Sequence, residues 1–130
     1  MMHPKDIKVL TQLTAAAFAA NRTRMGALRQ AEQALHDWLA ALDGARRGRA
    51  EGLSEADPAL VAGADLLWHS WIEQRRAALN AELSRNLVAQ EAARAALALT
   101  FGRDQATQSL AARALRDKIT SRTRRDEALS

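Results

Sequence analysis

The chain contains no cysteine and no tyrosine, and it has only two prolines and six glycines among 130 residues. The lack of cysteine excludes disulfide bonds and thiolate metal sites. The aromatic side chains, of which there are few, are Phe18, Trp38, Trp68, Trp71 and Phe101. With so few aromatic and β-branched residues, the composition disfavours a β-sheet domain and a large globular core.

The sequence also lacks the common signatures of catalysis and membrane insertion. No apolar run approaches the roughly 20 residues that span a bilayer. There is no glycine-rich phosphate loop, no paired-histidine zinc motif and no serine–histidine–aspartate arrangement. His69, with Asp65 and Glu73 four residues to either side, could form a weak metal site, but a charge-paired histidine is favoured. We therefore expect a non-enzyme with no catalytic, cofactor-binding or metal-binding residues.

The turn signals gather in one place. Four of the six glycines fall between Gly44 and Gly63, and Asp57 followed by Pro58 is typical of a helix start. The flanking segments are rich in Ala, Leu, Arg, Gln and Glu, which are strong helix formers. The sequence therefore predicts an all-α fold, an antiparallel two-helix coiled-coil hairpin with a longer C-terminal helix.

The predicted hairpin is a single domain covering the whole chain. We expect helix one over about 5–47, a bend over 48–57 and helix two over about 58–122, followed by a frayed tail over 123–130. In helix one, apolar residues recur with the alternating three- and four-residue spacing of a helix–helix seam. These residues are Leu28, Ala31, Leu35, Leu39 and Leu42.

Folding the chain near residue 52 gives a register for the two arms. It places Phe18 near Leu87, and Leu35 near Trp68 and Ile72. Helix two would then have no partner beyond Phe101, which leaves about 30 Å of basic, amphipathic helix. An exposed amphipathic end of this kind favours binding to a partner.

Charge and tryptophan placement point to binding surfaces. The net charge is +4, and residues 101–130 carry seven basic and four acidic groups, which favours an acidic partner there. The tryptophans could hold the two helices together near the bend, or they could form a surface that binds another protein. Because Trp68 and Trp71 lie three residues apart, a seam of two helices cannot bury both, so at least one indole should stay exposed as an anchor.

Three segments carry a family resemblance. The sequences Gln30–Leu35 and Ile72–Asn80, and the late element Arg125-Asp126-Glu127, resemble the corresponding parts of the FliJ family of flagellar type III export proteins. The resemblance spans roughly residues 20–128. It implies an antiparallel coiled coil similar to the central stalk of rotary ATPases, acting in the cytoplasm at the periphery of the membrane export apparatus.

The resemblance also implies partners. These are the hexameric export ATPase, the export-gate membrane protein and export chaperones. The family's gate-binding patch corresponds here to Ala34, Trp38, Ala41, Ala45, Ala64, Trp68, Trp71 and Arg75. The candidates for the ATPase-binding end are Arg113, Arg116, Lys118 and Arg122.

Two other functions fit the same composition. One is a type III export chaperone or a generic coiled-coil scaffold. The other, more remote, is a nucleic-acid-binding helical protein that uses the arginines of 46–49 and 122–125. Acidic residues lie close to both clusters and no aromatic residue accompanies either, so direct nucleic-acid binding is not expected.

Overall fold

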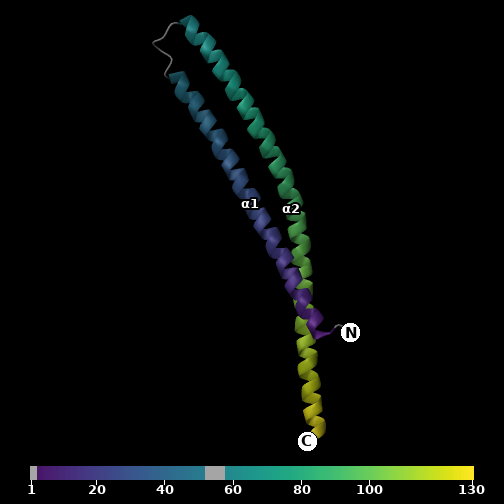
Figure 1. The fold of residues 1–130 in the computed structure, drawn as a ribbon. Helices are drawn as coiled ribbons and strands as arrows, with labels where there is room; N and C mark the ends of the chain where they lie inside the picture. Colours follow the sequence, from purple (N-terminus) through teal and green to yellow (C-terminus); the bar gives the residue numbers. More distant parts are fainter. Residues whose placement is uncertain (1–2, 52–57) are drawn as a thin grey trace. The chain divides into compact units, whose positions relative to one another are not determined.

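A computed structural model describes residues 3–51 and 58–130, and these are almost entirely helical (Figure 1). Helix α1 spans Pro4–Glu51 and helix α2 spans Pro58–Leu129. Pro58 takes the first helical position, where its missing N–H costs nothing. Both helices run past their expected ends, α1 from about 47 to Glu51 and α2 from about 122 to Leu129. Residues 48–51 of the expected bend and 123–129 of the expected tail are therefore helical. The last part of the expected bend, residues 52–57, lies outside the described residues.

The two helices pack against each other within two units. Unit 1 joins α1 up to Met25 with α2 from Ala92 onward, and unit 2 runs from Gly26 to Glu91. In unit 1, Asn21 contacts Thr100 and Thr14 contacts Thr107. Residues earlier in α1 thus contact residues later in α2. The helix segments of unit 1 therefore run antiparallel.

Unit 2 shows the same antiparallel order. Asn86 contacts Leu28, Arg76 contacts Asp43, and Arg49 near the end of α1 contacts Asp65. In both units most of the less accessible side chains recur at three- and four-residue steps, as left-handed helix pairing requires, with one step of seven residues from 42 to 49. On α1 these seam positions are 7, 11, 14, 18, 21 and 25 in unit 1, and 28, 32, 35, 39, 42 and 49 in unit 2. On α2 they are 65, 69, 72, 76, 79, 83, 86 and 90 in unit 2, and 93, 97, 100, 104, 107, 111 and 114 in unit 1.

The register expected from the glycine-rich bend is wrong. In unit 1 the Phe18 ring lies 5.5 Å from the Phe101 ring, measured between centroids, and so does not face Leu87. Arg22 adds its guanidinium at 5.7 Å from the Phe18 centroid. The seam consequently extends about 14 residues, or 21 Å, further along α2 than expected. The half-buried side chains end at Ala114, and every residue from 115 to 130 is exposed.

Polar side chains hold the register because they pair across the seam. In unit 1, Asn21 Nδ2 donates to the Thr100 hydroxyl at 3.1 Å and to the Ala96 carbonyl at 3.3 Å. The Thr14 hydroxyl lies 2.7 Å from that of Thr107 and donates to Asp104 Oδ1 at 3.3 Å. A buried polar group without a partner is costly, so sliding one helix past the other would leave these groups unsatisfied.

Unit 2 contains an equivalent polar layer. Gln90 Nε2 lies 2.6 Å from both Glu32 Oε1 and Asn86 Oδ1. Asn86 Nδ2 in turn donates to the Leu28 carbonyl at 3.0 Å. These bonds lower the pKa of Glu32 from its ordinary 4.5, chiefly through the hydrogen bond from Gln90 and next through that with His36.

The Glu32 layer predicts a pH dependence. Because the folded-state pKa lies below 4.5, the charged carboxylate contributes stability above that pH and loses it as pH falls through the folded pKa. We expect Glu32→Gln to be less stable than the parent chain at pH 7, and the difference to shrink below pH 4.5. Urea unfolding at pH 7 and pH 3 measures it. A stability difference that is the same at both pH values would contradict the assignment.

Ile72 is the most buried large side chain, at 1% exposure. Ile72→Ala should cost about 3 kcal/mol of unfolding free energy, because it removes contacts at the centre of the unit 2 seam. The matched control is Val88→Ala, where another β-branched side chain is 72% exposed and the expected change is within about 0.5 kcal/mol. Equal effects of the two substitutions in urea unfolding would show that the seam is misplaced.

Candidate protein-interaction surfaces

The residues that directly precede the seam positions form a distinct side of unit 2. Since the two helices run in opposite directions, a residue one step before a seam position on α1 and one on α2 face the same side of the pair. Seven of the eight residues expected to bind the gate occupy such positions, and the eighth, Ala45, precedes Arg46, which continues the spacing of the seam but is exposed. We call all eight the tryptophan face. They are Ala34, Trp38, Ala41, Ala45, Ala64, Trp68, Trp71 and Arg75.

The tryptophan face has two exposed indoles. Trp38 is 57% exposed and Trp71 is 55% exposed, which confirms that at least one indole remains accessible. A surface depression of about 320 Å³ lies beside Trp38, lined also by Ala34 and Asp37. The alanine side chains of this face offer little contact area. Trp38 and Trp71 therefore supply most of the apolar area that a partner could bury.

Trp68 has a different environment from the other two indoles. The Arg49 guanidinium stacks 4.7 Å from its ring centroid, and the His69 ring meets its edge at 5.3 Å with an interplanar angle of 72°. Trp68 is half-buried by these neighbours. It therefore ties the end of α1 to the start of α2, which is the structural role considered for the tryptophans.

The three tryptophans do not form one cluster. Trp68 lies level with Arg49 on α1, whereas Trp38 lies eleven residues before Arg49 on the same helix. At 1.5 Å per residue this separates the two levels by about 16 Å. Leu35 accordingly does not lie near Trp68, contrary to the expected register. A partner would meet two separate anchors along one side of unit 2.

Ion pairs surround the start of α2. Arg46 lies 3.8 Å from Glu73, and Arg49 lies 3.4 Å from Asp65 without forming a hydrogen bond. His69 Nε2 also lies 3.3 Å from Asp65. Because Glu73 pairs with Arg46, the set of His69, Asp65 and Glu73 does not converge on one point. Among the described residues, no group of three metal-ligating side chains is brought together.

The basic end of α2 belongs to unit 1. Arg113, Arg116, Lys118 and Arg122 are all exposed, and none forms an ion pair with a carboxylate of the described residues. The apolar side chains of Leu115 and Ile119 lie among them and are also more than half exposed. This combination leaves a cationic, amphipathic helix segment without a partner in unit 1.

No family model, curated protein or solved structure matches the chain. Neither helix, over the residues described, has an apolar stretch of the length and hydropathy needed to cross a bilayer.

The seam residues Asn21, Glu32, Gln90, Thr100 and Asp104 are important sites that the sequence interpretation missed. A usable signal was present, because the three- and four-residue alternation of the leucines continues through these polar positions. The apolar residues of α2 alone do not reveal this alternation, because Leu87 and Phe101 are apolar but nearly half exposed.

The contrast among the tryptophans can be tested directly. Trp38→Ala and Trp71→Ala should each change the unfolding free energy by less than about 0.5 kcal/mol, because both indoles are largely exposed. Trp68→Ala should cost about 1 kcal/mol or more, since it removes the stacking of Arg49 as well as packed area. Urea unfolding followed by circular dichroism measures all three. A Trp68 variant as stable as the other two would refute the structural role of that indole.

Proposed function

We propose that this chain is a non-enzymatic coupling protein of the flagellar type III export apparatus. In this proposal it is a cytoplasmic antiparallel coiled-coil hairpin that links the export ATPase ring to the export gate. The resemblance of 30–35, 72–80 and 125–127 to the FliJ family motivates the proposal, and it rests on no other comparison.

The observation that carries the proposal is how the two helices use their buried side chains. The side chains that are fully buried among the described residues all lie on the seam: Met25, Ile72, Leu79, Gln90, Ala93, Asp104 and Thr107. Half-buried side chains complete the seam, and the exposed ones face outward, where they can bind other proteins. A stalk protein needs such exposed side chains, because it acts by binding its partners and does not catalyse a reaction.

Two separate surfaces would bind the two partners. The tryptophan face of unit 2 would bind the gate through Trp38 and Trp71, with Trp68 and Arg75 beside them. The basic end of unit 1 would enter the ATPase ring, where Arg113, Arg116, Lys118 and Arg122 would meet acidic groups. Export chaperones are a further class of partner implied by the resemblance.

Ion pairing weakens the case for nucleic-acid binding. In the first arginine cluster, Arg46, Arg47 and Arg49 each lie within ion-pair distance of a carboxylate. Their positive charge is therefore partly neutralised before any phosphate arrives. The second cluster, within 122–125, has no aromatic side chain on which a base could stack.

Separate partner-binding defects would test the proposal. We expect the Trp38→Ala/Trp71→Ala double variant to bind the purified gate protein at least tenfold more weakly and the ATPase normally. The Arg116→Glu/Arg122→Glu variant should show the reverse pattern. Val88→Ala, an exposed change off the tryptophan face, serves as the control, and pull-down followed by calorimetry provides the affinities.

Two results would contradict this assignment. If the parent chain bound neither the ATPase nor the gate, it would not be an export stalk. If it bound the terminus of an export substrate but not the ATPase, the export-chaperone alternative would replace it.

A further inference from the structure

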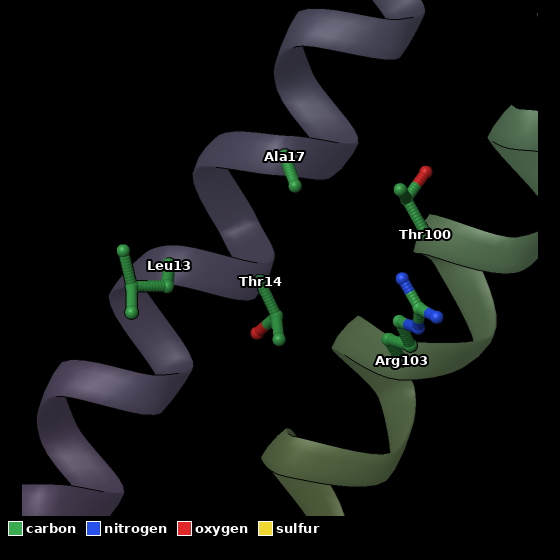
Figure 2. Close-up of a pocket in the computed structure, with 5 residues that line it drawn as sticks. All are labelled: Leu13, Thr14, Ala17, Thr100 and Arg103. Atoms are coloured by element: carbon green, nitrogen blue, oxygen red, sulfur yellow. The ribbon is translucent and has the colours of Figure 1, made fainter.

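In unit 1, the seam face of α2 is covered by α1 over most of its length. Figure 2 shows one such part, where Thr100 of α2 lies beside the α1 segment that carries Thr14 and Ala17. These positions are buried or half-buried because α1 packs over them. The later seam positions of α2 are Asp104, Thr107, Ala111 and Ala114.

The same spacing continues along α2 beyond this cover. Steps of four, three and four residues from Ala114 lead to Lys118, Ser121 and Arg125, which we call the basic stripe. All three residues of the basic stripe are exposed and helical. The seam face therefore changes from small side chains to cations without any break in the helix.

Helix α1 begins level with the start of the basic stripe. Thr14 contacts Thr107, and the first helical residue of α1, Pro4, lies ten residues before Thr14. In an antiparallel pair this corresponds to about residue 117 of α2. The basic stripe consequently has no helix across from it among the described residues of unit 1.

The charge around the basic stripe is strongly positive. Residues 113–125 contain six basic residues and one acidic residue, Asp117. None of the six forms an ion pair with a carboxylate in the part of the chain that the structure describes. Carboxylates of a partner, placed against Lys118 and Arg125, would form charge-assisted hydrogen bonds with them.

Two apolar side chains line one edge of the basic stripe. Leu115 and Ile119 are 60% and 56% exposed, and each directly follows a seam position. The same edge continues with Arg122 and Asp126, so its apolar part is only about one helical turn long. A partner helix can cover two such side chains, whereas a helix that lies in a membrane surface needs a longer apolar face.

We propose that the basic stripe binds an acidic helix of a partner protein, which takes the place of α1 along this face and pairs its carboxylates with Lys118 and Arg125. Continuity with the seam supports a helical partner, because the same face of the same helix already packs on α1 up to Ala114. The inference rests on the proposed function, since the stripe belongs to the end that we propose binds the ATPase. It specifies which cations make the contact and what kind of element meets them.

Charge and spacing disfavour a second copy of the chain as the partner. Lys118 and Arg125 are seven residues apart, and no two acidic residues of the sequence are separated by seven. A two-fold contact of the stripe with itself would place Lys118 of one copy against Arg125 of the other. Asp117 and Asp126 lie at the two edges of the stripe, so their carboxylates do not relieve this repulsion at its centre.

Three labelled helical peptides of about three heptads test the inference with the full chain. The first has glutamates seven residues apart and leucines along one edge, the second has lysines in place of the glutamates, and the third has the first peptide's composition with the glutamates spread around the helix. Fluorescence anisotropy at physiological ionic strength should show the first peptide binding at least tenfold more tightly than either of the others.

Two charge-matched variants locate the contact. Lys118→Glu/Arg125→Glu should weaken binding of the first peptide at least tenfold. Arg113→Glu/Arg116→Glu makes the same change of charge on side chains that lie about 120–180° around the helix from the stripe, and it should change the affinity less than threefold. Circular dichroism checks the helix content of each variant. If Lys118→Glu/Arg125→Glu loses helix, Lys118→Gln/Arg125→Gln should still abolish the preference for the first peptide.

Several results would overturn the inference. They are failure of the first peptide to bind, equal binding of the first and third peptides, and equal losses in the two glutamate variants, which would indicate attraction by net charge alone. Self-association of the parent chain in sedimentation that Lys118→Glu/Arg125→Glu abolishes would replace the partner helix with a second copy. Binding to phosphatidylserine vesicles or duplex DNA, but not to the first peptide, would replace it with a lipid surface or a nucleic acid.

The outcome is separable from that of the proposed function. A parent chain that binds the purified ATPase but not the first peptide would retain the proposed function and lose this inference. A parent chain that binds the first peptide through Lys118 and Arg125 but binds neither the ATPase nor the gate would do the opposite.

Discussion

The hydrogen bonds that cross the helix seam are the constraint on which the rest of the structure depends. A two-helix seam made only of leucine and alanine can pair in several registers that differ by whole heptads, because each offers similar apolar contact. Asn21 with Thr100, Thr14 with Asp104, and Glu32 with Gln90 are satisfied together in only one. These polar pairs occupy positions where apolar side chains would bury more area, and they determine which residues of the two helices face each other.

The register in turn decides what remains exposed. It brings Phe18 against Phe101 and ends the half-buried positions of unit 1 at Ala114, so that the basic end of α2 begins there. In unit 2 the register places the Arg49 guanidinium over the Trp68 ring. Trp38 then lies about 16 Å further along the helix pair. The exposure of the tryptophan face and of the basic end therefore depends on where the seam runs in each unit.

Helix type and approximate helix ends were predictable from the sequence, while the pairing was not. Helix formers with few breakers favour long helices, and Pro58 takes the first position of α2 as predicted. The glycine-rich stretch does not predict the register, because Gly44 and Gly48 lie inside α1 and so do not mark the bend. The exposure of an indole followed from the spacing of Trp68 and Trp71, but the stacking of Arg49 on Trp68 depends on the register and so could not be foreseen.

Cysteine cross-linking measures that register most directly, because the chain has no cysteine of its own. Two double variants are compared under mild oxidation, Phe18→Cys/Phe101→Cys and Phe18→Cys/Leu87→Cys. Positions 87 and 101 are about 21 Å apart along α2, so residue 18 cannot pair with both. We predict a rapid intramolecular disulfide in the first variant and none in the second. A disulfide only in the second would contradict the polar register and everything that rests on it.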